Sequence, residues 1–191
     1  MRQPEGAYVS EADAQLLQQF QQGEAAAFDT LFLRRHSQVY RVAYGLVGTR
    51  EQAEDLVQEA FLALYYQPPQ LGGEDSLLAW LCRVALNRGY NNLRGERRAR
   101  ERDERVGRLE VAEQPGPEVA LLRAEEQASV RAVLSSLPER QSRLLLLRYA
   151  GLSYAEIAAA LELAPGSVGT LLARAEKAFA AAFAQSELPT T

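Results

Sequence analysis

The 191-residue sequence contains one cysteine, Cys82, and one histidine, His36. A single cysteine cannot form a disulfide within the chain, and these two residues are too few to build a zinc site. Cys82 lies inside an apolar helical run and His36 inside an arginine-rich one, so we expect neither side chain to be reactive. We therefore predict a protein without disulfide, metal or cofactor.

Long hydrophobic runs are also missing. No stretch approaches the roughly 18 consecutive apolar residues of a membrane span, and the first residues lack the basic and then apolar pattern of a signal peptide. We expect no membrane insertion and a cytoplasmic location. The sequence also offers no nucleophile–base pair and no phosphate-binding glycine loop, so it does not indicate an enzyme.

Lysine is nearly absent, because Lys177 is the only one and all other basic residues are arginines. Acidic residues outnumber basic ones, and the formal net charge is −4. This balance argues against a protein that coats nucleic acid regardless of sequence. With 47% hydrophobic and 24% charged residues, the composition is that of a folded globular protein.

Strand signals are hard to find, whereas Ala, Leu, Glu, Gln and Arg dominate, so we predict an all-α fold. The stretch 96–118 is charged, lacks aromatic residues and contains Pro115-Gly116-Pro117, which is typical of a linker between domains. The sequence therefore predicts two small helical domains, residues 10–95 and 119–186, joined by a flexible linker.

A helix with two different faces is predicted to begin after Thr49, which starts a capping-box pattern with Gln52. One face is apolar and suits burial. The other face is acidic except for Leu62, and it consists of Glu51, Glu54, Asp55, Gln58, Glu59 and Leu62. Such a face is either a solvated surface, with early carboxylates that favour the helix N-terminus, or a docking surface for a basic partner. Leu62 favours docking.

The segment from Ser76 to Arg94 carries a possible nucleic-acid face opposite its apolar stripe. Arginine binds phosphates, asparagine pairs with base edges, and tyrosine or tryptophan stacks on an unpaired base. The residues of this face are Arg83, Asn87, Tyr90, Asn91 and Arg94, with Trp80 nearby. A plain solvated surface is the alternative.

The second half has the layout of a helix-turn-helix. A helix begins at Leu137-Pro138-Glu139, Ser153 and Glu156 form a capping box for a short helix, and Pro165 starts a further helix. The outward face of that last helix is expected to carry Ser167, Thr170, Leu171, Arg174 and Lys177. DNA binding and a plain helical bundle both remain open on this pattern alone.

Several of these segments together resemble the extracytoplasmic-function group of the sigma-70 family of bacterial sigma factors. The segment Ala53–Phe61 is similar to the helix by which that family grips the clamp coiled coil of RNA polymerase. The resemblance implies a core RNA polymerase interface that contains Asp55, Gln58, Glu59 and Leu62.

The run Trp80–Asn87, followed by arginines, resembles the helix by which this family recognises and melts the minus-ten promoter element. In the family, the loop before that helix captures a flipped base, which points to residues 67–75. The segments Leu137–Gln141, Gly151–Ala158 and Pro165–Val168 are similar to the domain that reads the minus-thirty-five element.

The resemblance implies a sigma factor that binds core RNA polymerase and promoter DNA and directs recognition, melting and initiation, with an anti-sigma protein as a further partner. Two alternatives have to be weighed against it. A stand-alone helix-turn-helix regulator would bind duplex DNA as a dimer at palindromic sites. A helical interaction module would not bind DNA at all.

The sequence departs from the family pattern at three positions. Gly169 and Leu171 stand where a lysine and an arginine are usual, so two DNA contacts are missing. We therefore expect the second domain to bind its element weakly and with a shallow salt dependence. Asn91 stands where an aspartate is common, which removes a negative charge from the expected minus-ten face.

Overall fold

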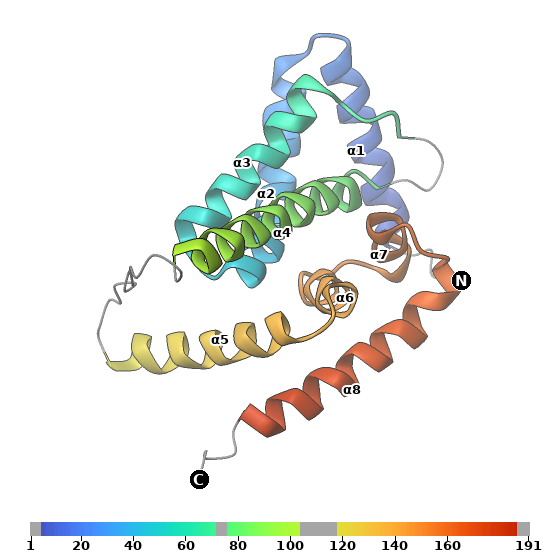
Figure 1. Ribbon diagram of the computed structural model, residues 1–191. Helices are drawn as coiled ribbons and strands as arrows, with labels where there is room; N and C mark the ends of the chain where they lie inside the picture. Colours follow the sequence, from blue (N-terminus) through green and yellow to red (C-terminus); the bar gives the residue numbers. More distant parts are fainter. Residues whose placement is uncertain (1–4, 72–75, 104–117, 187–191) are drawn as a thin grey trace.

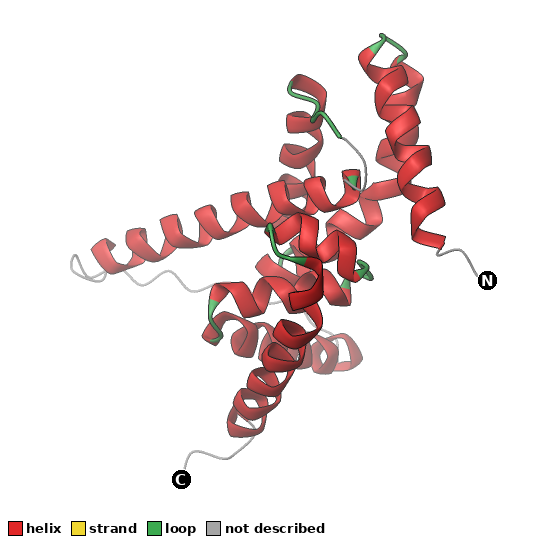
Figure 2. Cartoon of the chain, turned by 90° about the vertical axis from the view of Figure 1, so that its right-hand side faces the viewer, coloured by secondary structure: helices red, strands yellow, loops and turns green. Residues whose placement is uncertain are grey.

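The computed structural model describes residues 5–71, 76–103 and 118–186 (Figure 1). Over these ranges the regular elements are helices and no strand occurs, as Figure 2 shows. The prediction of an all-α protein with a helix-turn-helix in its second half is confirmed. The same ranges contain no single helix long and apolar enough to cross a membrane; α7 (Tyr154–Leu161) and Pro165–Ser186 pass that test only as a pair bent by 111°.

The first half consists of four helices arranged around the second one. Helix α2 contacts α1, α3 and α4. The helices are α1 (Glu5–Gln21), α2 (Ala25–Val47), α3 (Arg50–Tyr66) and α4 (Leu77–Asp103). Gly48 ends α2 with a φ of 81°, a left-handed conformation that glycine adopts without strain. Thr49 caps α3 by accepting a hydrogen bond from the Gln52 backbone N–H, which is one half of the predicted capping box.

Helix α4 is longer than the sequence suggests. We expected the first domain to end near Gly95, with a linker over 96–118, but α4 continues to Asp103. The residues after Gly95 are mostly Arg, Glu and Ala, which are strong helix formers, and one glycine costs too little to end such a helix. The remainder of the expected linker, residues 104–117, lies outside the described residues.

The second half contains the helix-turn-helix. Its elements are α5 (Glu118–Ser136), α6 (Glu139–Tyr149), α7 (Tyr154–Leu161), a 3-10 turn (Pro165–Ser167) and α8 (Val168–Ser186). The capping box at Ser153 and Glu156 is present, with the reciprocal side-chain and backbone bonds. Proline at position 165 starts the 3-10 turn, and the α-helix proper begins at Val168.

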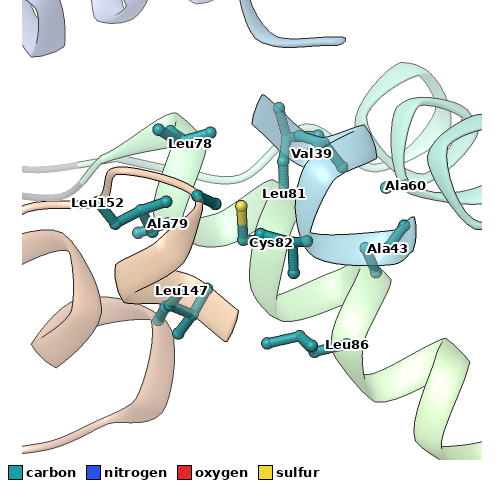
Figure 3. Packing of buried hydrophobic residues seen from close by; sticks show 14 of the residues in the cluster. Val39, Ala43, Ala60, Leu78, Ala79, Leu81, Cys82, Leu86, Leu147 and Leu152 are labelled. Atoms are coloured by element: carbon teal, nitrogen blue, oxygen red, sulfur yellow. The ribbon is translucent and has the colours of Figure 1, made fainter. Parts of the chain in front are cut away.

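The two halves share one hydrophobic core, which the sequence analysis did not foresee. Helix α7 contacts α4, and α6 contacts α2. Figure 3 shows Leu147 and Leu152 of the second half facing Ala79 and Cys82 of α4. Burying a leucine side chain contributes about 1.5–3 kcal/mol, so these apolar contacts are the main force that holds the halves together.

Candidate nucleic-acid and polymerase interfaces

The acidic face of α3 is directed away from the core. Asp55 and Gln58 are exposed, and Leu62 is 44% exposed, which is high for a leucine. Glu59 is half-buried, and its Oε2 atom lies 3.5 Å from Arg88 Nε on α4. On the opposite side of α3, leucine, valine, alanine and phenylalanine side chains fill the core. The four residues predicted to bind polymerase therefore lie together on one face, with the carboxylates around an exposed apolar side chain.

Two exposed tyrosines extend this surface beyond the predicted residues. Tyr65 and Tyr66 at the end of α3 are 53% and 75% exposed. The Tyr65 ring packs on the rings of Phe20 and Phe28, and these two contacts fix its position at the end of α3. The sequence contains the Tyr65-Tyr66 pair at the end of the acidic helix, and that aromatic pair was a signal that the sequence analysis did not use.

The predicted minus-ten residues lie on one stretch of α4 but differ in exposure. Asn87, Asn91 and Arg94 are exposed, whereas Arg83 is half-buried. The two aromatic residues are less available than expected, because Trp80 and Tyr90 are both half-buried and packed against the core. Burial also raises the pKa of the Tyr90 phenol. In this conformation neither ring is a free platform for a base.

The second half of the molecule covers this stretch of α4. Arg83 Nη1 lies 2.8 Å from Glu162 Oε1, and Arg94 Nη1 lies 2.9 Å from Glu139 Oε2. Arg143 donates a hydrogen bond of 2.8 Å to Asn87 Oδ1. We call these six residues the polar interdomain cluster: Arg83, Asn87, Arg94, Glu139, Arg143 and Glu162. All of them except Arg94 line an open cleft of about 460 Å³ between the halves.

The outward face of α8 is only partly as expected. Thr170, Arg174 and Lys177 are exposed, but Leu171 is half-buried and packs against the hydrophobic core. Ser167 is half-buried, and its hydroxyl donates a hydrogen bond of 2.7 Å to the Ala164 carbonyl. Of the five predicted residues, two cations and one hydroxyl-bearing side chain are therefore exposed.

The position of Gly169 lies beside α7. A Cβ atom there would meet Tyr154 Cε2 at 3.4 Å, an ordinary contact, so the described structure gives no steric reason for glycine. The Arg148 guanidinium lies 5.5 Å from the centroid of the same Tyr154 ring, within the range of a cation–π contact. Arg148 thus places a cation close to Gly169, where a lysine is usual in the family that the sequence resembles. Because Arg148 belongs to α6, the sequence of α8 alone does not reveal this cation.

The remaining sequence expectations concern single residues and one loop. Cys82 is fully buried, and burial raises the pKa of its thiol. His36 lies between two aromatic rings, stacked on Tyr40 and tilted against Phe32. Of the loop at 67–75, only residues 67–71 are described, and the rest of that prediction lies outside the described residues.

Family models match most of both halves. The Sigma-70 region 2 model matches residues 31–99, and the Sigma-70, region 4 model matches residues 127–179. The RNA polymerase sigma-H factor of Pseudomonas aeruginosa is 32% identical over 179 residues, covering 89% of this chain and 93% of that protein. The ECF RNA polymerase sigma-E factor of Escherichia coli K12 is 31% identical, covering 87% of this chain and 91% of that protein.

Two solved structures share the fold at lower identity. CnrH, solved in complex with the cytosolic domain of CnrY, has a TM-score of 0.67 and 22% identity, covering 93% of this chain and 99% of that chain. The sigma factor RpoE of Bartonella quintana, solved with the anti-sigma factor NepR, has a TM-score of 0.59 and 23% identity, covering 82% of this chain and 96% of that chain.

Proposed function

This chain belongs to the extracytoplasmic-function group of the sigma-70 family of RNA polymerase sigma factors, and we propose which of its surfaces carry out that role. It binds core RNA polymerase and directs promoter recognition, melting and initiation. The polymerase forms the bonds, so the chain is not an enzyme, and it works with the polymerase in the cytoplasm. The similarity to sigma factors over both halves supports this function over that of a stand-alone helix-turn-helix regulator.

The acidic face of α3 binds the clamp coiled coil of the polymerase. The observation that carries this proposal is that Asp55, Gln58 and Leu62 are exposed together on the face of α3 opposite the one that fills the core. Carboxylates around an apolar side chain suit a partner surface with basic residues around an apolar patch, because the charges steer the encounter and the leucine supplies buried area. Tyr65 and Tyr66 enlarge the apolar part of this interface.

The minus-ten element binds on α4. Arg83 and Arg94 contact phosphates, Asn87 and Asn91 pair with base edges, and Tyr90 and Trp80 stack on unpaired bases. The minus-thirty-five element is read by Ser167 at the end of the 3-10 turn and by four residues of α8, which are Thr170, Leu171, Arg174 and Lys177. Since Leu171 is half-buried and two usual cations are missing, we expect this second contact to be weak.

A regulatory partner is also proposed. The RpoE protein of Bartonella quintana was solved with an anti-sigma factor, and this chain shares its fold. We expect an anti-sigma protein to bind this chain as well.

In vitro transcription with purified core polymerase on a promoter library tests these assignments. Asp55→Arg places a cation in the acidic face and should abolish core binding, whereas Asn87→Ala should keep core binding and lose promoter opening. The matched controls are Glu176→Arg, at an exposed position of α8, and Asn92→Ala, at an exposed position of α4, and both should retain the two activities. Failure of the wild-type protein to initiate from any promoter would refute the function, and unchanged core binding by Asp55→Arg would refute the α3 assignment.

A further inference from the structure

A second cleft, of about 620 Å³, lies between α2 of the first half and α5, α6 and α8 of the second. Sites for small molecules in proteins usually have volumes of about 300–1000 Å³. None of the residues that line this cleft is among those assigned above to polymerase or to promoter DNA. The cleft therefore has the size of a ligand site, and the proposed function does not use it.

The lining of the cleft is mainly apolar and aromatic. The rings of Tyr40 and Tyr44, on successive turns of α2, stack on each other with their centroids 5.8 Å apart and form one aromatic wall. The other walls include Leu134 of α5, Leu145 and Leu146 of α6, and Phe179 of α8. A flat aromatic molecule suits such a lining, because it packs on leucine side chains and pairs with aromatic rings.

A glycine keeps the bottom of the cleft open. A Cβ atom on Gly45 of α2 would lie 2.8 Å from Leu146 Cδ2 of α6. Beyond the chain neighbours and the backbone of its own helix, no other atom would lie within 4 Å of that Cβ. Glycine at this position therefore lets α2 and α6 approach each other and leaves room beside them.

The charged groups around the cleft are mostly cations. Arg41, Arg131 and Arg148 line it, and Glu126 is the one carboxylate among its lining residues. Within the described ranges, none of these three arginines forms an ion pair with a carboxylate. Arg131 instead lies 6.0 Å from the centroid of the Tyr44 ring. The surroundings of the cleft are thus positive, although the whole chain carries a formal charge of −4.

We propose that this cleft is a binding site for a small aromatic carboxylate. The aromatic body packs on the leucines and against the Tyr40 and Tyr44 rings, and the carboxylate accepts hydrogen bonds from Arg41 and Arg131 at the edge of the cleft. A guanidinium group matches a carboxylate in shape and charge, and hydrogen bonds between them are stronger than those between neutral groups.

A ligand in this cleft touches both halves of the molecule at once. Its body contacts α2 on one side and the helices of the second half on the other. A molecule that binds the folded chain and not the unfolded chain stabilises the fold by mass action. Occupancy of the cleft therefore couples the concentration of a small molecule to the stability of the contact between the halves.

The probe for this site is 2-naphthoate, and 2-naphthamide is its neutral analogue of nearly the same shape. Isothermal titration calorimetry with the full-length protein gives the two dissociation constants, and thermal unfolding gives the shift in midpoint. We expect 2-naphthoate to raise the unfolding midpoint and to bind about tenfold more tightly than 2-naphthamide, because only the anion forms charge-assisted hydrogen bonds. Decanoate, an aliphatic carboxylate, should bind more weakly than 2-naphthoate.

Two variants locate the binding in this cleft. Val130→Trp places a large side chain into the cleft from α5, and its matched control is Ser129→Trp, at an exposed position of the same helix outside the lining. Arg41→Gln with Arg131→Gln removes two cations, and its control, Arg140→Gln with Arg174→Gln, removes two exposed cations elsewhere. Each test variant should weaken 2-naphthoate binding by about tenfold. Both controls should bind it as the wild type does.

The proposal is overturned if 2-naphthoate at millimolar concentration neither binds the wild type nor shifts its unfolding. Equal binding of the anion and the amide overturns the role of the arginines, and tighter binding of decanoate overturns the aromatic assignment. Unchanged affinity in both test variants, or an equal loss in their controls, overturns the location. The arginine variant keeps the apolar walls, so it decides the question even if Val130→Trp disturbs the packing of α5.

Discussion

A buried ion pair attaches α1 to α2, and its removal tests how the first half is stabilised. Arg35 Nε lies 2.6 Å from Asp13 Oδ2, and the two residues are only 6% and 1% exposed. Arg34 lies 3.9 Å from the other carboxylate oxygen, which has no hydrogen-bond partner within the described structure. Burying this carboxylate costs desolvation free energy, and nearly all of the interaction that offsets this cost comes from Arg35.

Removing one member of this pair should cost much more than removing both. Arg35→Met leaves the Asp13 carboxylate buried beside only a partly exposed arginine, and breaking a buried pair in this way costs about 3–5 kcal/mol. For a chain of this size, that corresponds to a fall in Tm of roughly 10 °C. Asp13→Leu combined with Arg35→Met removes both desolvation penalties and should be close to neutral.

The stability contributed by Asp13 should also depend on pH with an unusual sign. Burial outweighs the two arginines and raises the pKa of the Asp13 carboxyl above its ordinary value of 3.8. The folded state then holds this proton more tightly than the unfolded state does. The stabilisation that comes from this tighter proton binding is fully present below pH 3.8, and it is lost as the pH rises through the pKa of Asp13 in the folded state. The wild type should therefore lose stability relative to Asp13→Asn as pH rises through that window.

Urea unfolding followed by circular dichroism measures the free energy of unfolding at pH 7 for four proteins. They are the wild type, Asp13→Leu, Arg35→Met and the double variant, which together form a double-mutant cycle. Arg34→Met is the control, because its side chain is 47% exposed, and it should change the free energy of unfolding by less than about 0.5 kcal/mol. A cost below about 1 kcal/mol for Arg35→Met, or a double variant that costs the sum of the single ones, would refute this reasoning.

Two further predictions concern single residues. Gly48→Ala should lower the free energy of unfolding by about 1–3 kcal/mol, because alanine is strained at a φ of 81° and its Cβ would overlap the Arg131 side chain; thermal unfolding checks this, and a neutral result contradicts it. Cys82 should resist iodoacetamide in the folded protein and react after unfolding, because burial raises the pKa of its thiol; mass spectrometry before and after urea treatment detects the adduct, and rapid native labelling contradicts it.

The sequence was sufficient for features that depend on near neighbours. Helix ends at Gly48, Thr49 and Ser153 follow from capping chemistry that acts over three or four residues. The exposed acidic face of α3 follows from helical periodicity. The roles of its residues in binding polymerase stay predictions, because periodicity identifies a face and not the partner.

The sequence was insufficient where the outcome depends on distant contacts. Periodicity gave no indication that Asp13 would meet Arg35, or that Glu162 would meet Arg83, because charge pairs between separate helices leave no local pattern. One signal of domain contact was present, however. The middle of α6 is apolar on nearly all sides from Leu144 to Leu147, and such a helix needs burial on more than one face.

The shared hydrophobic core has a consequence for how substitutions are tolerated. Because leucines of α6 and residues of α4 belong to one cluster, the chain should unfold as a single cooperative unit. A substitution that weakens the second half then also lowers the stability of the first half. Natural selection therefore acts on the two halves as one folding unit, and changes on the surface of either half are limited to substitutions that leave the common core intact.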